Sequence, residues 1–599
     1  MGRDFSNQQI ADLLDQVAAA YIVKRGNPFK IAAYERAAVA VEHATSAVKD
    51  LWDEGKLEEI PGIGENIASY LDELFRFGKV AHFEKLMQDL PPAMFVLLNL
   101  PGVGAKTAYH LCKELGLYQE KTALNKLKKA AQSGKIARIK GFGPRSEKEI
   151  LEATDLFLKN KGQPKRMTLA YAYQQANEII NYLKAFPEVL KVDPLGSLRR
   201  MVATIGDIDI SVATSQPKVV IEAFVHYPQA KKLVEKGEEG ATIMLKNGCS
   251  IDLRVQKPPS YGAMLQYFTG SKEHNIHLRE LALKKGLSLS EHGIKIISQN
   301  KIETYASEEA FYQKLGLDWI PPEIRENQGE IEAAQKGNLP NLVNIKNIKG
   351  DLHTHSNFPI EESHDPGLDS MPKMIEKAAQ LGYQYLGFTE HNPSQSQHSE
   401  KQIIKLIKAK KEAIEQINSS RGKKLLKHVF NGLEIDIKPD GCLAISEAAL
   451  DLLDYGIASI HSVFNLSQKK MTARVIRGLS HPKIKILGHP TGRLLEAREG
   501  YELDWERIFA FCLKNNKWLE INAYPDRLDL PDFLVKLAVK NGVKMVINTD
   551  AHALKQLSYL FFGVSVARRG WAPASLIANC LPYDKMREQL LKGGEKKCH

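Results

Sequence analysis

Three aspartates near the middle of the chain have the spacing of a site for divalent cations. Asp207 and Asp209 are two residues apart in the segment GDIDISVAT, so on a β-strand their carboxylates project from the same face. Asp252 lies in a second predicted strand, SIDLRV, and can complete the set. Two hard cations held by such carboxylates activate an attacking hydroxyl and stabilise the leaving group. Because an isolated DxD is common at surface turns, the residues around it decide whether this interpretation holds.

The residues that precede the aspartates are suited to binding a phosphate chain. Gly196 and Ser197 offer a backbone turn and a hydroxyl. Arg199 and Arg200 supply guanidinium groups suited to a triphosphate. The order GS, RR, DxD and a later Asp is far more selective than DxD alone, and it predicts nucleotidyl transfer.

Histidines and carboxylates recur through the C-terminal half. They occur in DLHTHS, TEH, GLEID, SIHS, GHPTGR and NTDAH, within residues 351–552. Predicted strands alternate here with helix-length segments, which is typical of repeated βα units. Strand ends in such a fold converge at one end of a barrel, so these side chains predict a multinuclear metal centre.

Three glycine turns, at 60–71, 100–111 and 139–150, share one pattern: an apolar residue, GxG and a predicted helix. Glycine lets backbone N–H groups approach an anion, and the next helix N-terminus favours phosphate. Residues 101–166 carry 15 Lys and Arg against 6 Asp and Glu, a net charge of +9. Together these features predict a polyanionic partner. The turns resemble helix-hairpin-helix motifs, which implies contacts to DNA phosphates from Gly62, Gly64, Gly102, Gly104, Lys106, Lys140, Gly141, Gly143 and Arg145.

Composition is that of a globular protein with several domains: 599 residues, 43% hydrophobic and 26% charged, with a net charge of +11. Six cysteines without a CxxC pair are too sparse for a disulfide framework. We find neither a bilayer-length apolar run nor a signal-peptide pattern in the sequence. We therefore expect a cytoplasmic monomer without a membrane partner.

The segments GSLRR, GDIDI, IDLRV and YFTGSKEHNIHLRE resemble the polymerase beta-like family X of DNA polymerases, over nearly the whole of residues 1–320. The resemblance implies that Asp207, Asp209 and Asp252 bind Mg²⁺ and that Asp252 also serves the primer 3′-hydroxyl. It implies a dNTP site in which Gly196, Ser197, Arg200 and Gly206 hold the triphosphate, Tyr267, Phe268 and Gly270 select deoxynucleotides, and Asn275 and Arg279 face the nascent base pair and template.

The first helical region departs from the lyase-active relatives in this family. Tyr70 stands where those relatives have a lysine that forms a Schiff base, and a phenol cannot form an imine. Lys30, Tyr34 and Arg36 remain as expected contacts for a 5′-phosphate. We therefore expect binding of a DNA end without lyase chemistry at Tyr70.

Residues from 351 to 552 are similar to PHP domains, phosphoesterases with a TIM-like barrel. The resemblance implies that Mn²⁺ or Zn²⁺ is bound by His353, His355, His391, Glu434, His461, His489, Asp550 and His552. Ile360 occupies the place of a usual aspartate ligand, for which Glu361, Glu362 or Asp365 are possible substitutes, and Glu390 replaces the aspartate of TDH. Metal binding is therefore expected, with nuclease activity that is weak or absent unless Glu361 or Glu362 reaches the vacant position.

The expected fold is multidomain, with α/β and α+β parts. The expected domains are an N-terminal helical DNA-end-binding domain at 1–90, a helix-hairpin-helix subdomain at 91–160, a nucleotidyltransferase palm at 161–256, a nucleotide-selection subdomain at 257–320, a linker at 321–348 and a PHP barrel at 349–599.

The favoured function is a DNA-directed polymerase that uses dNTPs to fill gapped or nicked DNA in repair, with an attached 3′-5′ exonuclease or AP endonuclease. A DNA-end-binding module with decayed catalysis is an alternative, but the complete aspartate triad argues against it. A template-independent nucleotidyltransferase is another, although the glycine turns favour a duplex substrate. A sugar-phosphate phosphatase would explain the C-terminal half only.

Overall fold

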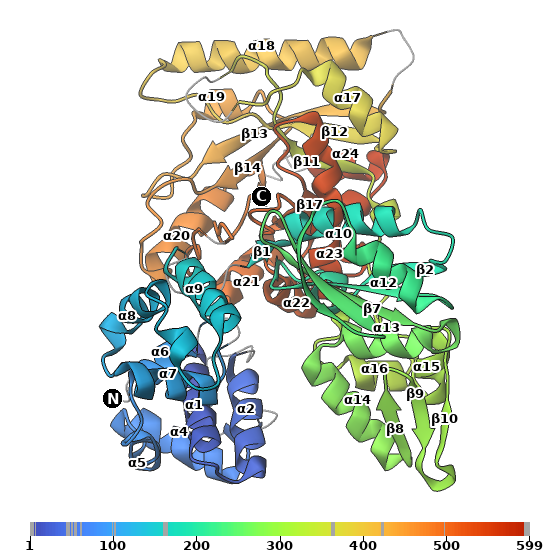
Figure 1. Cartoon of the computed structure of the whole chain (residues 1–599). Coiled ribbons are helices and arrows are strands. Elements are labelled where there is room, and N and C mark those ends of the chain that lie inside the picture. The colour runs from blue at the N-terminus through green and yellow to red at the C-terminus, as the bar shows by residue number, and fades with distance from the viewer. Residues whose placement is uncertain are drawn as a thin grey trace. The chain divides into compact units, whose positions relative to one another are not determined.

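The computed structural model describes residues 5, 7–42, 48, 52, 57–59, 63–98, 100, 103–159, 166–360, 366–420, 425–495 and 497–591. The chain divides into two compact units, Met1–Lys165 and Arg166–His599, which are taken here in turn (Figure 1). Among the described residues, every helix is too short or too polar to cross a membrane.

The N-terminal unit is helical, as predicted. Its helices are α1 (Asn7–Val23), α2 (Pro28–Glu42), η1 (Leu57–Glu59), α4 (Glu65–Phe77), α5 (Ala81–Met87), α6 (Ala93–Leu97), α7 (Ala105–Leu115), α8 (Glu120–Gln132), η2 (Ile136–Arg138) and α9 (Pro144–Lys159). In α4 the apolar residues recur at helical spacing, so Ile67, Leu71 and Leu74 are buried together. Gly78 ends this helix in the left-handed conformation, with φ of 74°. Two apolar cores result, one around α1, α2 and α4 and one around α6, α7 and α8.

The second unit begins with a five-stranded mixed sheet that carries the aspartates. Its strands are β2 (Lys191–Pro194), β4 (Ile208–Ala213), β5 (Ala230–Lys236), β6 (Gly240–Leu245) and β7 (Ser250–Gln256), in the order β2-β4-β7-β6-β5. The accompanying elements are α10 (Leu169–Leu183), α11 (Gly196–Arg199), α12 (Pro217–Val225) and the short pair β1 (Met167–Thr168) and β3 (Thr204–Ile205). Strands β4 and β7 are parallel neighbours although about forty residues of chain separate them. This pairing brings the DxD segment and Asp252 side by side, near the amino ends of the two strands.

A small α+β subdomain follows the sheet. It contains η3 (Pro258–Ser260), α13 (Tyr261–Thr269), α14 (Lys272–Lys284), β8 (Leu287–Ser290), β9 (Gly293–Ile296), η4 (Ile297–Gln299), β10 (Lys301–Glu303) and α15 (Glu308–Lys314), with a three-stranded sheet of order β10-β9-β8.

The segment 321–348, predicted to be a linker, is folded into the same unit. It forms η5 (Pro322–Ile324), α16 (Glu330–Gln335) and η6 (Ile345–Asn347). Ile324, Arg325, Ile331 and Val343 are buried. Its polar composition reflects buried ion pairs, such as Arg325 with Glu308 at 2.6 Å, so low apolar periodicity did not mean exposure to solvent here.

The C-terminal part is a barrel of seven parallel strands. They are β11 (Gly350–Thr354), β12 (Tyr385–Phe388), β13 (His428–Asp436), β14 (Tyr455–Ser459), β15 (Ile484–Leu487), β16 (Trp518–Asn522) and β17 (Met545–Asn548), and they pair in chain order. The helices between and after them are α17 (Met371–Gln380), α18 (Glu400–Ser419), α19 (Glu447–Leu450), α20 (Gln468–Leu479), α21 (Trp505–Asn515), α22 (Asp532–Asn541), η7 (Leu554–Tyr559), α23 (Leu560–Arg569), η8 (Ala574–Leu576), η9 (Ala578–Cys580) and α24 (Tyr583–Leu591). A parallel bridge between Thr354 and Ala551 links the first strand to the end of the last, so the barrel is nearly closed. The TIM-like barrel predicted for this half is confirmed.

Candidate active sites

The palm aspartates lie on two paired strands. The Cα atoms of Asp209 on β4 and Asp252 on β7 are direct partners in the parallel ladder, and Asp207 immediately precedes β4. Burial, followed by the charges of Asp252 and Asp207, raises the pKa of Asp209 to about 6. Carboxylates gathered in a half-buried place repel one another, and a bound divalent cation relieves that repulsion. The donor set therefore fits hard metal ions.

The glycine-serine turn packs directly against this carboxylate cluster. The backbone N–H of Leu195 donates to the carbonyl oxygen of Asp209 at 2.8 Å, which fixes the start of α11 beside β4. Gly196 has φ of 56°, and a Cβ there would lie 2.7 Å from the Asp209 Oδ2 atom. Only glycine fits, because a side chain would meet the aspartate and strain the backbone. Ser197 follows on α11 and is half-buried.

The two arginines after this turn have different partners. Arg199 donates from Nη1 and Nη2 to the Glu308 carboxylate at 2.9 and 2.7 Å, so its guanidinium, expected at the triphosphate, is held inside the protein. Arg200 donates from Nε to Glu326 Oε1 at 3.0 Å and from Nη1 to the Thr269 carbonyl oxygen at 2.5 Å. Arg200 is thereby placed against the segment that precedes Gly270.

The other residues expected at the nucleotide lie around the junction of α13 and α14. A Cβ on Gly270, whose φ is 69°, would lie 3.1 Å from Nη1 of Arg200, so these two residues of the set are neighbours. Tyr267 and Phe268 pack edge to face with ring centroids 5.1 Å apart. Asn275 donates from Nδ2 to the Tyr267 carbonyl oxygen at 2.7 Å. Gly206 and Arg279 are exposed to solvent.

The barrel histidines and carboxylates converge at the carboxyl ends of the strands. Seven of the eight expected ligands fall into three groups whose ligand atoms lie within 4.8 Å of one another: His353, His355, Glu434 and Asp550; His391, Glu434 and His461; His355, His391 and His552. The eighth, His489, has its Nε2 atom 2.9 Å from Glu434 Oε1. Glu434, His355 and His391 each belong to two of these groups, and Glu434 also contacts His489, so the groups form one cluster.

Buried polar atoms in this cluster indicate that it holds metal ions. Within the described part of the chain, the Nε2 atoms of His353, His355 and His552 and Oδ1 of Asp550 are buried without a hydrogen-bond partner. Native proteins rarely leave such atoms unpaired, and metal ions satisfy them. Burial alone would raise the pKa of Glu434, but the nearby histidines hold it well below its usual value. The residues present therefore fit a metal centre.

Supporting residues that sequence patterns did not reveal orient these ligands. Glu520 accepts from Nδ1 of His353 at 2.7 Å, and Asp436 lies 2.5 Å from Nδ1 of His461. Such contacts fix which ring nitrogen faces the metal. Asn522 donates from Nδ2 to Asp550 Oδ2 at 3.0 Å. The available signal was a carboxylate, Glu520, within the otherwise largely apolar segment of β16.

The two departures from the usual PHP pattern have different surroundings. Ile360 is 3% exposed and belongs to the apolar core. Its proposed substitutes Glu361, Glu362 and Asp365 lie outside the described residues. Glu390, in contrast, forms a buried ion pair with Lys410, a fully buried lysine on α18.

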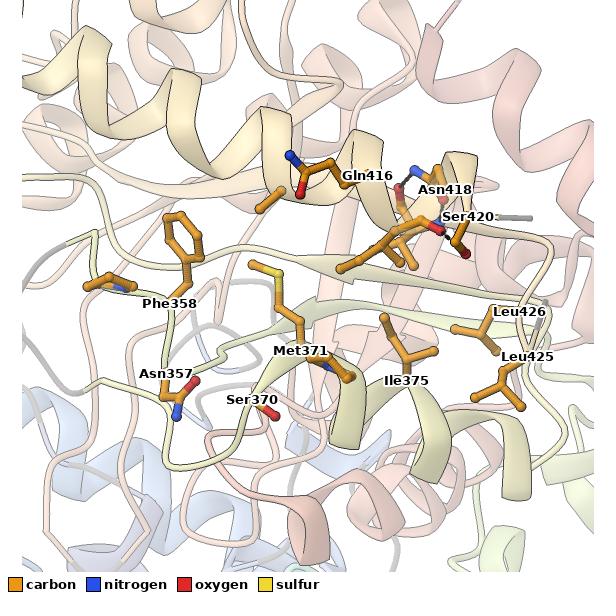
Figure 2. A pocket seen from close by; sticks show the side chains of 15 residues that line it. Asn357, Phe358, Ser370, Met371, Ile375, Gln416, Asn418, Ser420, Leu425 and Leu426 are labelled. Atoms are coloured by element: carbon orange, nitrogen blue, oxygen red, sulfur yellow. Dashed lines mark hydrogen bonds between the residues drawn. The ribbon is translucent and has the colours of Figure 1, made fainter. Parts of the chain in front are cut away.

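A cavity of about 650 Å³ lies elsewhere in the barrel domain, between α17 and α18 (Figure 2). Phe358, Met371, Ile375 and Leu426 give it an apolar lining. None of the described residues that line it is an expected metal ligand. The cavity is therefore separate from the cluster.

The glycine turns of the N-terminal unit precede helices, as predicted. Gly64 and Gly104 are the residues directly before α4 and α7, and Gly143 directly precedes α9. Gly141 has φ of 94°, a conformation that favours glycine. Gly62 and Gly102 lie outside the described residues. Lys106, Lys140 and Arg145, which flank the turns, are all exposed.

The residues expected at a DNA 5′-phosphate are separated by the structure into exposed and buried ones. Lys30 and Arg36 are exposed on α2. Tyr34 is 5% exposed and stacks on Tyr21 with ring centroids 5.6 Å apart, so its ring is part of the core. Tyr70 stacks on the His82 ring at 5.0 Å.

Comparisons with known proteins agree with this architecture. Models of a helix-hairpin-helix domain, a SAM-like helix-hairpin-helix tandem, the DNA polymerase beta thumb and the PHP domain match residues 5–80, 95–155, 264–326 and 351–524.

Relatives cover both halves. The chain is 34% identical over 574 residues to DNA polymerase/3′-5′ exonuclease PolX of Bacillus subtilis (strain 168), covering 96% of this chain and 97% of that protein. It is 24% identical over 353 residues to DNA polymerase lambda of Rattus norvegicus, covering 53% of this chain and 56% of the relative. A probable phosphatase of Caldicellulosiruptor saccharolyticus is 32% identical over 133 residues, 21% of this chain and 53% of its own length. Because the PolX protein is matched almost from end to end and the polymerase beta thumb and PHP models also match, the chain belongs to the bacterial family X DNA polymerases that carry a C-terminal PHP domain.

Proposed function

We propose that this protein is a DNA-directed DNA polymerase that fills short gaps in DNA during repair, and that its barrel is a metal-dependent 3′-5′ exonuclease. The observation that carries the polymerase half is the placement of Asp209 opposite Asp252 on paired strands, with Asp207 adjacent. The converged cluster around Glu434 carries the exonuclease half.

In the palm, Asp207, Asp209 and Asp252 would hold Mg²⁺. The ions, when bound, supply the positive charge that acidifies the primer 3′-hydroxyl and stabilises the leaving pyrophosphate. Asp252 would also orient the hydroxyl: it is the direct ladder partner of Asp209, and its carboxylate accepts from the Thr242 hydroxyl.

The remaining nucleotide contacts would come from the turn and from the α13–α14 junction. Ser197, Arg200 and Gly206 bind the triphosphate. Gly270, Tyr267 and Phe268 crowd the sugar, and Asn275 and Arg279 face the base pair and template. Exposed basic residues beside the glycine turns bind phosphates of gapped or nicked DNA, and we propose that the protein acts on it as a cytoplasmic monomer.

In the barrel, the cluster's imidazole and carboxylate ligands suit Mn²⁺ or Zn²⁺. His353 and His461 are each oriented by a carboxylate, which keeps one ring nitrogen directed inward. The chain thereby provides the rigid donor set that metal-assisted phosphodiester hydrolysis requires.

One experiment separates the two activities. Wild type, Asp209→Asn and Asp550→Asn are compared in two assays. The first measures incorporation of dNTPs into gapped DNA with Mg²⁺, and the second measures cleavage of 3′-labelled DNA with Mn²⁺. We expect Asp209→Asn to lose incorporation and keep 3′ cleavage, with the reverse for Asp550→Asn. Exposed carboxylates give matched controls, Glu238→Gln in the palm and Asp451→Asn in the barrel. Retention of more than about a tenth of the wild-type incorporation rate in Asp209→Asn would count against the triad, since a tenfold effect is only about 1.4 kcal/mol.

A further inference from the structure

An arginine of the PHP domain reaches the nucleotide-binding part of the palm. Arg569 is the last residue of α23 and only 9% of its side chain is exposed. Its Nη1 donates to the carbonyl oxygen of Arg200 at 2.8 Å and to Glu326 Oε1 at 2.9 Å. Its Nε donates to Asp532 Oδ2 at 2.7 Å, which fixes the plane of the guanidinium. One side chain of the barrel thus contacts both the backbone of Arg200 and the carboxylate beside it.

Glu326 is the shared partner of two arginines. The same oxygen, Oε1, accepts from Nε of Arg200 at 3.0 Å and from Nη1 of Arg569 at 2.9 Å. Arg200 has a second fixed contact, from Nη1 to the Thr269 carbonyl oxygen. Both contacts hold the guanidinium of Arg200 beside Gly270. Without Arg569, Arg200 would be the one cation left at Glu326 among these three residues. The carbonyl oxygen of Arg200 would also lose the hydrogen bond that it accepts from Arg569.

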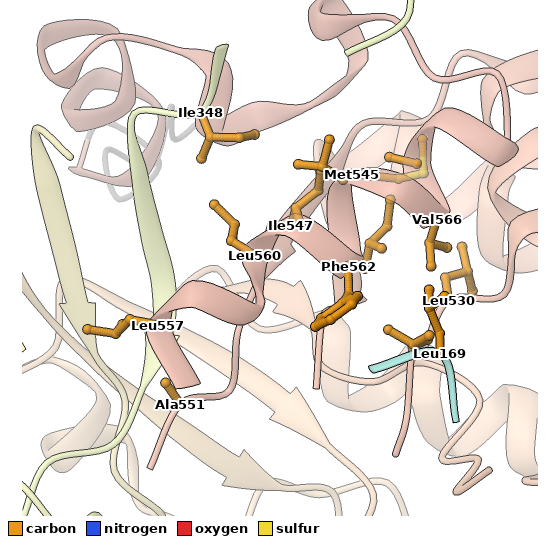
Figure 3. Close-up of a cluster of buried hydrophobic side chains, with 14 of the residues drawn as sticks. Leu169, Ile348, Leu530, Met545, Ile547, Ala551, Leu557, Leu560, Phe562 and Val566 are labelled. Atoms are coloured by element: carbon orange, nitrogen blue, oxygen red, sulfur yellow. The ribbon is translucent and has the colours of Figure 1, made fainter. Parts of the chain in front are cut away.

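The surface from which Arg569 projects is anchored to the palm by apolar packing. Leu169 at the start of α10 belongs to the same buried cluster as Leu530, Phe562 and Val566 of the barrel domain (Figure 3). The ring of Tyr173, one turn further along α10, packs against Phe562 with centroids 5.9 Å apart. Because α23 is held on its apolar face, the position of Arg569 relative to Arg200 is well defined.

We propose that Arg569 is a positioning residue for polymerisation, acting through Glu326 to preorganise Arg200 for the triphosphate of the incoming nucleotide. The proposal rests on the polymerase function proposed above. A guanidinium that is already held in place loses less side-chain freedom when it binds phosphate. If removal of Arg569 lets the Arg200 guanidinium move more freely, nucleotide binding should weaken. The PHP domain is then part of the polymerase site and not only an attached nuclease.

The test is single-turnover incorporation into gapped DNA at varied dNTP concentration. Arg569→Met should raise the apparent Kd for dNTP about tenfold and change the maximal rate much less, because Arg569 does not contact the reacting atoms. Arg568→Met is the matched control on the same helix. Arg568 pairs with Glu323 at 2.7 Å but does not contact Arg200, so the apparent Kd of this variant for dNTP should stay within twofold of wild type.

A double-variant cycle tests the route through Glu326. If Arg569 acts through this carboxylate, Arg569→Met combined with Glu326→Gln should weaken nucleotide binding less than the two single effects added. Should Arg569→Met fail to fold, Asp532→Asn is the second variant. Asp532 is half-exposed and its carboxylate orients Arg569, so this substitution should also raise the Kd for dNTP. Unchanged Kd in Arg569→Met or Asp532→Asn, or an equal rise in Arg568→Met, would overturn the proposal. Wild type that incorporates no dNTP would instead overturn the proposed function.

Discussion

The ion pair between Arg199 and Glu308 offers a quantitative test of how the palm is joined to the subdomain after it. Glu308 is 4% exposed and accepts from Arg199 at 2.7 Å and from Arg325 at 2.6 Å. Burial alone would raise the pKa of Glu308, but Arg325 and Arg199 lower it from 4.5 to about 2. The change corresponds to about 3 kcal/mol of stabilisation at neutral pH. Replacing the carboxylate by an amide removes this same interaction and leaves the buried Arg325 guanidinium without its counter-charge, which is consistent with a loss of about 3 kcal/mol.

We therefore expect Glu308→Gln to lower the opening free energy of the surrounding segments by about 3 kcal/mol at pH 7. The folded-state pKa lies below the unfolded one, so this stabilisation is fully present above about pH 5 and is lost as pH falls through about 2. At pH 3 the difference between wild type and variant should shrink to less than half its value at pH 7.

Hydrogen exchange followed by mass spectrometry measures the local opening free energy, in peptides that cover residues 196–205 and 306–326. It suits a chain of several domains, in which a single unfolding transition is not well defined. Glu309→Gln is the matched control, because Glu309 is the exposed neighbour of Glu308 on α15. A difference below about 1 kcal/mol at pH 7, or one that grows toward low pH, would refute the reasoning.

Three further outcomes are expected. Binding to gapped DNA should weaken steeply with salt, and Arg145→Ala should reduce the log–log slope by about one, since each phosphate contact releases about one counterion; a flat salt dependence would contradict this. Borohydride trapping on abasic DNA should give no adduct at Tyr70, because a phenol forms no imine, and peptide mapping of any adduct would locate a different nucleophile. Lys410→Met should lower the opening free energy of the barrel strands, measured by hydrogen exchange, and the amount of bound metal, because it leaves Glu390 buried without its cation; adding Glu390→Gln should restore both. A double variant no better than the single one would show that the pair has no such role.

Sequence patterns located the palm carboxylates because their spacing is local. The two-residue interval between Asp207 and Asp209 is sufficient to place both on one strand face. The contact with Asp252 depends on β4 and β7 being neighbours, which follows from sheet order and not from spacing. The sequence pattern places Arg199 at the phosphate because it contains no sign of the true partner: Glu308 is 109 residues away in the chain.

Burial in the helical unit and in the barrel was harder to predict. Tyr34 is expected from the family resemblance to contact a 5′-phosphate, but its ring completes an aromatic core with Tyr21 and Phe83. Lys410 lies in a lysine-rich helix that reads as a solvated face, and only its distant partner Glu390 explains its burial. The convergence of the expected metal ligands of the barrel was predictable because each lies near or just after the carboxyl end of a strand, and parallel strands end together.

The apolar contact between α10 and α23 has a consequence for shortened versions of the protein. A chain that ends near residue 348 would keep Leu169 and Tyr173 but lose Phe562, Leu530 and Val566, which now cover them. The exposed patch would favour aggregation. The shortened chain would also lose Arg569, so its low activity would not distinguish aggregation from the loss of this positioning residue. Single substitutions in the full-length chain are therefore the sound way to determine what each half contributes to activity.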